Sequence, residues 1–278
     1  MKKIIFLFLM VSFSSFAQNN YPLDYFRSPL DIPLRLAGTF GELRNNHFHA
    51  GIDIKTNRRI GLPVYATANG YISRIKVAIW GYGKVIYINH PNGYTTVYAH
   101  LNKFGDEIQE YVKNIQYKKE SYETGNIFPK KDQFMVTKGQ IIGYSGRTGG
   151  FVAPHLHYEI RNTKTEKIIN PLLFGIKIKD SIAPKIKKLI AYPIGLNSKI
   201  NRSLKNQSIS IKKDSLNNYT ANRLSASGKI GFGINVYDLL GKELNKNGIY
   251  SLEMKINGKR KYYHDVETFS FSESKFIN

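Results

Sequence analysis

Histidine is the residue type that most clearly indicates chemistry in this 278-residue chain. Seven histidines are present, and five of them lie in three short motifs, His47–Asp53, Val97–Leu101 and His155–His157. The first motif also carries Asp53, so nitrogen and carboxylate ligands occur together. Cysteine is absent, so a metal ion in this chain has to be held by His, Asp or Glu. Two histidines and one carboxylate, with a fourth position open to water, are a known arrangement of catalytic zinc.

His155 and His157 are expected to project from the same face of a strand. Side chains two residues apart in a strand lie on one face, about 6–7 Å apart, while Leu156 faces the opposite side. One imidazole can then bind a metal ion while the other reaches a metal-bound water. A His-x-His pair by itself also fits an ordinary exposed strand. We expect Glu159 to point to the opposite face from a ligand, as a structural residue or one at the rim of a groove.

His49 and Asp53 can share one ion only if the chain bends between them. On a straight strand their positions would be about 13 Å apart, and Gly51 with its β-branched neighbours argues against a helix. We therefore expect a bend near Ala50–Gly51, which the glycine permits. The spacing favours His49 as the ligand but leaves His47 as an alternative, because the two histidines lie two residues apart on one face.

Mostly β structure is expected to position these motifs. From about residue 38 to 175, short β-branched and aromatic runs alternate with turn signals. His100 ends one of these runs, where it fits either a site residue or the surface end of a strand. A long insertion, Asn102–Thr137, separates two of the runs, and Tyr111–Glu120 within it is expected to form a short helix. The predicted strands are Pro63–Val77 (broken at the turn dipeptide Asn69-Gly70), Lys84–Asn89, Tyr94–His100, Gln140–Tyr144 and His155–Arg161.

A second β-rich region is expected over residues 180–278. Its strand-like runs and the turn dipeptide Asn257-Gly258 are typical of a small Ig-like β-sandwich. A strand-like Thr268–Phe271 lies close to the last residue without a closing element, so we expect this domain to be incomplete. The runs are Ile186–Ile194, Ser208–Lys212, Lys229–Leu240 and Ile249–His264.

The first residues have the pattern of a secretory signal peptide. Lys2 and Lys3 precede the short apolar run Ile4–Val11, and Ser15–Ala17 offers small residues for cleavage. We expect residues 1–17 to be removed, residues 18–37 to form a lead-in segment, and the mature protein to reach the periplasm or cell envelope. An uncleaved membrane anchor is the alternative, but the apolar run is short for a span.

The charge of the chain favours anionic partners. A formal net charge of +21 falls to +19 when Lys2 and Lys3 leave with the signal peptide. For an exported protein the anionic partners are a cell-envelope polymer or a membrane surface. Lysines scattered over a solvated face explain the same charge. No nucleic-acid-binding motif is present, and export argues against a nucleic-acid partner.

The three histidine motifs resemble those of the lysostaphin-type (LytM-like) zinc endopeptidases. They read His49-Ala-Gly-Ile-Asp53, Tyr98-Ala-His100-Leu101 and Pro154-His155-Leu-His157-Tyr-Glu159. The stretches between them, such as Pro63–Ala66 and Gly143–Gly146, match as well, and the resemblance covers about residues 38–175. Two departures stand out: Ala153 replaces a glycine that is often found there, and the insertion after Leu101 is long.

The resemblance implies an antiparallel β-sheet metallopeptidase domain with a groove and a Zn²⁺ cofactor. It implies that His49, Asp53 and His157 hold the zinc, that His155 acts on the attacking water and that His100 stabilises the transition state. The implied substrate is peptidoglycan, cut in its peptide cross-links or stem peptides. A non-catalytic envelope module that binds peptidoglycan or activates another hydrolase is the alternative, although such relatives usually lack the zinc ligands.

Overall fold

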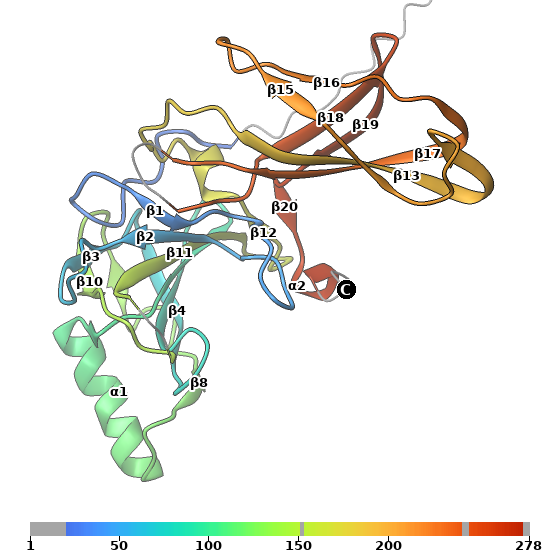
Figure 1. Cartoon of the computed structure of the whole chain (residues 1–278). Helices are drawn as coiled ribbons and strands as arrows, with labels where there is room; N and C mark the ends of the chain where they lie inside the picture. Colours follow the sequence, from blue (N-terminus) through green and yellow to red (C-terminus); the bar gives the residue numbers. More distant parts are fainter. Residues whose placement is uncertain (1–20, 151–152, 241–244, 275–278) are drawn as a thin grey trace, which may run out of the picture.

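The computed structural model describes residues 21–150, 153–240 and 245–274, so the predicted signal peptide lies outside the described residues. Figure 1 shows a β-rich body that carries helix α1, and an extended C-terminal region beside it. Of the helices in the described ranges, none combines the length and the apolar character that a membrane crossing needs. The mostly β, antiparallel fold class predicted from the sequence is confirmed.

The body is built on one antiparallel sheet. Its strands follow the order β1-β2-β11-β6-β5-β4-β8, so strands that are far apart in sequence meet at its centre. Three short strands extend it: β9 (Met135–Val136) pairs with β4, and β12 (Ile168–Ile169) pairs with β11 and with β20 (Thr268–Phe269). The main strands are β1 (Leu36–Gly38), β2 (Ile52–Lys55), β4 (Gly70–Val77), β5 (Lys84–Asn89), β6 (Tyr94–Ala99), β8 (Gly125–Ile127) and β11 (His155–Asn162).

A second, three-stranded sheet contains β3 (Pro63–Tyr65), β10 (Ile141–Tyr144) and β7 (Lys103–Phe104). The predicted run Pro63–Val77 does break in two, but its halves, β3 and β4, belong to different sheets. The reason lies in the link between them. The backbone N–H of Ala66 donates to Gln140 O and that of Thr67 to the hydroxyl of Tyr98, so neither is available to a hairpin.

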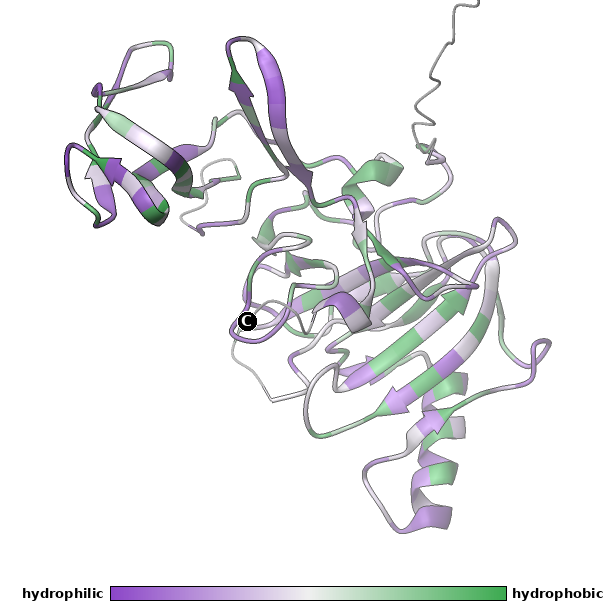
Figure 2. Cartoon of the chain, turned by 90° about the vertical axis from the view of Figure 1, so that its right-hand side faces the viewer, coloured by the Kyte–Doolittle hydropathy of each residue, from purple (hydrophilic) through white to green (hydrophobic). Residues whose placement is uncertain are grey.

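The two faces of the main sheet differ in character. Leu156, Tyr158 and Ile160 of β11 are fully buried in the large apolar core, together with side chains from β2, β4, β5 and the small sheet. The opposite face carries a much smaller apolar cluster, Val85, Tyr87, Val97 and Ala99. Figure 2 shows the resulting alternation of polar and apolar residues along the strands. The polar motif residues therefore lie on the face that the large core leaves free.

The insertion forms a longer helix than the sequence pattern predicts. Helix α1 spans Asp106–Lys119, and its C-cap is Glu120, whose backbone is left-handed with φ of 50°. It begins five residues before the predicted start because Asp106 and Glu107 suit the positive end of the helix dipole. Ile108 and Val112 bury the apolar side of the helix against the core.

The C-terminal region consists of separate small sheets. Its largest sheet has the order β14-β13-β17, and two hairpins stand beside it. The Asn257-Gly258 turn is confirmed, with φ of 50° and 75° at these residues. Among the described residues of this region, only Ala191 and Ile200 are buried hydrophobic residues, and the Ig-like sandwich is not confirmed. The strands are β13 (Lys185–Ile200), β14 (Gln207–Ile209), β15 (Ile211–Lys213), β16 (Tyr219–Ala221), β17 (Ala226–Tyr237), β18 (Ser251–Ile256) and β19 (Lys259–Asp265).

The end of the C-terminal region returns to the body (Figure 1). Strand β20 pairs with β12, and helix α2 (Phe271–Ser274) follows it. The short 3₁₀ helix η1 (Pro171–Phe174) lies between β12 of the body and β13 of the C-terminal region. Strand β20 comes from the predicted C-terminal domain but belongs to the main sheet of the body. The predicted boundary between two domains near residues 175–180 therefore stays a prediction.

Candidate metal centre

Strand register brings His157 and Asp53 together. In the antiparallel pair β2–β11, His157 lies directly opposite Asp53, and His155 lies opposite Lys55. In the pair β6–β11, His157 lies opposite Ala99, the last residue before His100. Residues opposite each other in neighbouring strands point to the same face. His155, His157 and Asp53 therefore share the face away from the large core.

The chain bends between His49 and Asp53, as the sequence predicts. The loop before β2 is closed by two backbone hydrogen bonds of 2.9 Å, from His49 N to Glu42 O and from Gly41 N to His49 O. Gly51 lies at the bend, but its φ is not left-handed. Its role is to save space, since a Cβ at this position would overlap the carbonyl oxygen of Tyr158. A glycine is therefore needed for the close approach of β11 rather than for an unusual backbone conformation.

His49, Asp53 and His157 form a group that fits a metal ion. Asp53 Oδ1 lies 3.1 Å from His49 Nε2 and 2.9 Å from His157 Nδ1, and the two nitrogens are 3.1 Å apart. Ligand atoms of a tetrahedral zinc with bonds of about 2.0–2.1 Å lie about 3.3 Å apart. Two nitrogens and one carboxylate oxygen at this spacing are the donor set that zinc prefers, and the distances require little movement on binding.

Both ligand histidines have their other ring nitrogen occupied. His49 Nδ1 donates to the carbonyl oxygen of Thr39 at 2.7 Å, which leaves Nε2 to face the group. His157 Nε2 donates to Glu159 Oε1 at 2.8 Å, which directs Nδ1 to the group. Such outer partners fix the tautomer and the ring orientation of metal-binding histidines. The sites that remain available on the two rings are therefore the ones that converge on Asp53.

Glu159 contradicts its sequence-based interpretation. It was expected on the face opposite a ligand, but it is fully buried on the same face as His157, because the two residues are two positions apart in β11. Arg161 pairs with Glu159 Oε2 at 2.6 Å, and the hydroxyl of Tyr82 donates to Glu159 Oε1. The same alternation that joins His155 to His157 would have placed Glu159 and Arg161 correctly. Tyr82 has no comparable signal in the sequence.

The charges of the group are arranged to hold a cation. Burial opposes a charge on His157, but hydrogen bonds to Asp53 and Glu159 outweigh burial and raise its pKa to about 9. Burial likewise opposes ionisation of Asp53, but its contacts with His157 and His49 keep its pKa well below the usual value. Arg161 is the main cause that lowers the pKa of the buried Glu159 to about 2. Without a metal, the cation between these two carboxylates is thus the proton on His157.

A second set of contacts holds the other oxygen of Asp53. Arg44 lies 3.2 Å from Asp53 Oδ2 and 3.5 Å from Glu42 Oε2. Gly38 makes room for this arrangement, since a Cβ there would overlap the Arg44 guanidinium. With Oδ2 occupied by Arg44, Oδ1 is the oxygen that faces the histidines. Arg44 carries no signal in the sequence, because it lies nine residues before Asp53 and only the fold of the loop brings the two side chains together.

His155 and His100 stand beside the group rather than in it. Their ring centres are 4.7 Å apart, and His155 Nε2 lies 3.7 Å from Asp53 Oδ1. Each has Nδ1 bound to a backbone carbonyl: His155 to Ala153 at 2.9 Å, and His100 to Thr148 at 2.8 Å. Nε2 of each ring is thereby left as an acceptor.

The backbone of His100 is left-handed, with φ of 60°, and this ends β6. Burial, followed by repulsion from His157 and His155, lowers the pKa of His100 to about 3. The remaining histidines lie outside the group. His47 is exposed and pairs with the side chain of Asn46, which removes it as the alternative to His49 in this arrangement.

Parts of the chain are similar in sequence to known proteins. Residues 47–117, which include His49, Asp53 and His100, match the sequence profile described as "Peptidase family M23". The DD-carboxypeptidase/endopeptidase Mpg of Neisseria meningitidis is 35% identical over 132 residues, 46% of this chain and 24% of that protein. The peptidoglycan DD-endopeptidase ShyA of Vibrio cholerae is 31% identical over 140 residues, 48% of this chain and 26% of that protein.

Lysostaphin of Staphylococcus staphylolyticus is 30% identical over 142 residues, which are 51% of this chain and 22% of that protein. Each match thus spans about a quarter of the relative's length. Two of these relatives are named as a carboxypeptidase/endopeptidase and a peptidoglycan endopeptidase, in agreement with the motifs. Residues 47–117 are therefore similar in sequence to peptidase family M23, and the resemblance to the lysostaphin-type enzymes is confirmed.

Proposed function

We propose that this chain is a zinc metalloendopeptidase that cuts peptide cross-links or stem peptides of peptidoglycan. The observation that carries the proposal is the convergence of His49, Asp53 and His157, with two further histidines directly beside them. A complete donor set with neighbouring proton acceptors is more than a binding module needs. A non-catalytic envelope module is therefore the less favoured function.

In this proposal His49, Asp53 and His157 hold the zinc through Nε2, Oδ1 and Nδ1. Zinc in a site with an open position polarises a carbonyl and lowers the pKa of water to about 7. His155 is the general base, since its Nδ1–H is held by Ala153 O and its Nε2 is free to accept a proton from the attacking water. The same nitrogen then delivers that proton to the leaving amine.

For His100 we propose a different part from the one that the resemblance implies. Stabilisation of a developing oxyanion requires a donor, but its Nδ1–H is held by Thr148 O and its pKa of about 3 keeps Nε2 unprotonated. A neutral Nε2 accepts hydrogen bonds. We propose that His100 orients the attacking water together with His155.

The substrate and the location are part of the same proposal. Relatives named as peptidoglycan DD-endopeptidases point to the peptide part of peptidoglycan. The signal-peptide pattern and the net charge of +21 agree with an exported protein that meets an anionic envelope polymer. We propose the periplasm or cell envelope as its location.

The test is digestion of purified peptidoglycan with mass analysis of the released fragments. The zinc-loaded protein is expected to release peptide fragments, a chelator to stop the reaction, and added zinc to restore it. His157→Ala and Asp53→Ala are expected to lose bound zinc. His155→Ala is expected to keep zinc and lose 10²–10⁴-fold in turnover. Full hydrolysis after removal of zinc would contradict the proposal, and loss of zinc in His155→Ala would mean that the roles of His155 and His157 are exchanged.

A further inference from the structure

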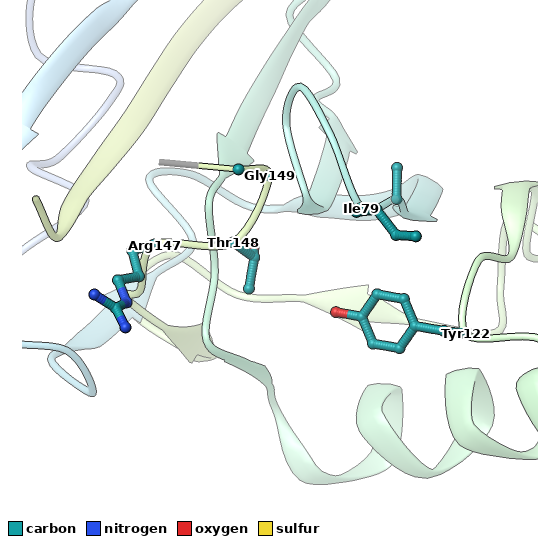
Figure 3. A pocket seen from close by; sticks show the side chains of 7 residues that line it. Ile79, Tyr122, Arg147, Thr148 and Gly149 are labelled. Atoms are coloured by element: carbon teal, nitrogen blue, oxygen red, sulfur yellow. The ribbon is translucent and has the colours of Figure 1, made fainter. Parts of the chain in front are cut away.

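A hollow of about 400 Å³ is lined in part by Thr148, whose carbonyl oxygen accepts a hydrogen bond from His100 beside the candidate metal centre. Its walls come from three segments that are distant in sequence: the turn after β4 with Ile79, the insertion with Tyr122, and the glycine-rich loop Arg147–Gly150. Figure 3 shows Ile79 and Tyr122 on one side of Thr148 and the Arg147 side chain extending to the other. None of these residues belongs to the metal group or to its outer partners.

The floor of the hollow is held firmly in place. Thr148 Oγ1 accepts from Lys84 N at 2.9 Å and donates to Leu101 O at 2.8 Å, while its carbonyl oxygen accepts from His100. A Cβ at Gly149 would overlap the Gly81 carbonyl oxygen, so the loop packs directly on the turn after β4. The hollow is therefore preformed, as ligand sites usually are.

The wall that contains Tyr122 is fixed as well. The residues after it attach to the turn after β4: Ile79 N donates to Glu123 Oε1 at 2.8 Å, and Val77 N donates to Thr124 Oγ1 at 3.0 Å. Thr124 N in turn donates to Val77 O at 3.1 Å. These hydrogen bonds fix the part of the long insertion that forms a wall of the hollow.

The surface around the hollow is suited to a ligand. Trp80, Ile79 and Tyr122 are large apolar residues with exposed fractions of 70%, 52% and 51%. Exposed apolar side chains gathered at a concave site mark binding surfaces. Arg147 is exposed, and within the described residues its guanidinium has neither a hydrogen bond nor an ion pair. An unpaired guanidinium is a preferred partner of carboxylates, which it binds through two parallel hydrogen bonds.

We propose that this hollow is a subsite for a peptide that carries a free carboxylate. The apolar part of the peptide lies between Ile79 and Tyr122, and its carboxylate pairs with Arg147. A ligand that reaches both must cross Thr148, whose carbonyl oxygen holds the ring of His100. This inference rests on the proposed function, because it assigns the hollow to the part of the substrate that extends beyond the cleaved bond.

Trp80 provides the measurement, since it is the only tryptophan of the chain and a Cβ at Gly150 of the hollow would touch its ring. The full-length zinc-loaded protein, with His155→Ala to prevent turnover, is titrated with acetyl-Gly-Ala-Ala and followed by tryptophan fluorescence. The same peptide as its C-terminal amide is the neutral probe. The carboxylate form is expected to bind at least tenfold more tightly, the order of a charge-assisted hydrogen bond.

Two variants localise the binding. Arg147→Gln is expected to abolish the preference for the carboxylate, and Tyr122→Ala to weaken both peptides. Arg223→Gln, at another exposed arginine, is the matched control and is expected to change nothing. If Arg147→Gln keeps the preference, the carboxylate binds elsewhere, for example at the zinc, and the inference is wrong. It is also wrong if a chitin trisaccharide changes the fluorescence and neither peptide does.

Failure of the subsite and failure of the proposed function give different results. Binding is measured without turnover, so a chain that hydrolyses nothing can still show the carboxylate preference. Conversely, an active enzyme whose KM for carboxylate-bearing peptides is the same in Arg147→Gln contradicts the subsite alone. The subsite predicts a higher KM in that variant with kcat unchanged.

Discussion

At the residue scale, Glu159 is the side chain that holds the ligand His157 in position. It accepts a hydrogen bond from His157, is paired with Arg161, and receives the hydroxyl of Tyr82, all without contact with solvent. The carboxylate thus fixes the ring of His157 and makes its other nitrogen a better donor to a cation. Glu159 would act on a bound zinc ion through its hydrogen bond to His157.

Replacement of Glu159 by Gln is expected to weaken zinc binding 10–100-fold, the usual cost of losing such a partner. The variant keeps the size of the side chain but loses the charge that orients His157 and balances Arg161. Competition with a chelating dye measures the affinity. Glu166→Gln is the control, because Glu166 also pairs with Arg161 but is half exposed and does not contact His157. Equal affinities of the two variants would contradict this role.

His90 makes the stability of the body depend on pH. Burial lowers its pKa to about 4, although a hydrogen bond to the carbonyl of Asn69 partly opposes the shift. Below pH 6.5 His90 binds a proton in the unfolded chain but stays neutral in the folded protein. The free energy of unfolding therefore falls as the pH drops from 6.5 towards 4. We expect a loss of about 2 kcal/mol between pH 7.5 and pH 5 from this residue.

Urea unfolding at the two pH values tests this expectation. The difference in unfolding free energy between the parent chain and His90→Gln should shrink by about 2 kcal/mol at the lower pH. A pH-independent difference for His90→Gln would show that the buried ring does not titrate as its surroundings require.

The site residues differ in how well they can be predicted from the sequence. His155 and His157 follow from strand alternation, and Glu159 would have followed from the same rule had it been applied. The choice of His49 over His47 came from the family resemblance, since spacing alone left both open. Arg44 was not accessible, because its contact with Asp53 depends on how the loop folds back over Gly38.

At the element scale, the pairing of β2 with β11 depends on Gly51. This residue lies against the carbonyl oxygen of Tyr158 and the side chain of Glu159, with no room for a Cβ. The close approach keeps Asp53 opposite His157. The strand pair therefore relies on the smallest residue at the point where the chain enters β2.

Gly51→Ala is expected to destabilise the body by about 1–3 kcal/mol, because the added methyl group must displace backbone atoms. It should also weaken zinc binding, since Asp53 moves with β2. Thermal unfolding and zinc titration measure the two effects. Gly105→Ala is the matched control: its φ is −58°, and an added Cβ would meet nothing closer than 3.4 Å. Similar losses in both variants would contradict the steric argument.

Individual strands were easier to predict than their partners. The expected limits of β5, β6 and β11 agree with the structure to within one residue, because these runs of β-branched and aromatic residues are bounded by clear turn signals. Assignment of β3 and β4 to different sheets was out of reach, since it depends on hydrogen bonds from the linking residues to Gln140 and Tyr98.

At the scale of the whole molecule, the segment Val266–Ser274 joins the C-terminal region to the body. Phe269 packs between the rings of Phe40 and Phe48, at centre distances of 5.0 and 5.7 Å. Ser274 Oγ accepts a hydrogen bond from Phe48 N at 2.8 Å. Glu267 accepts from the Tyr21 hydroxyl at 2.7 Å. Because Phe48 immediately precedes His49, this segment supports the loop that presents a ligand.

Phe269→Ala is expected to lower the stability of the body by about 2 kcal/mol, less than for a fully buried phenylalanine. It should also weaken zinc binding, because Phe48 loses the ring that supports it. Phe232→Ala on β17, where the side chain is 53% exposed, is the control and should change neither property. Unfolding curves and zinc titrations provide both measurements. Unchanged zinc affinity in Phe269→Ala would show that the loop holds His49 without the segment.

The hydrogen bond between Phe48 and Ser274 joins residues 226 positions apart, and this separation bears on the order of synthesis. A ribosome makes His49, Asp53 and His157 before any residue of the segment Val266–Ser274. A growing chain therefore contains every donor of the metal group while the loop before His49 still lacks its packing partners. During translation the donors of the candidate metal group are therefore complete before the segment that supports the loop has been made.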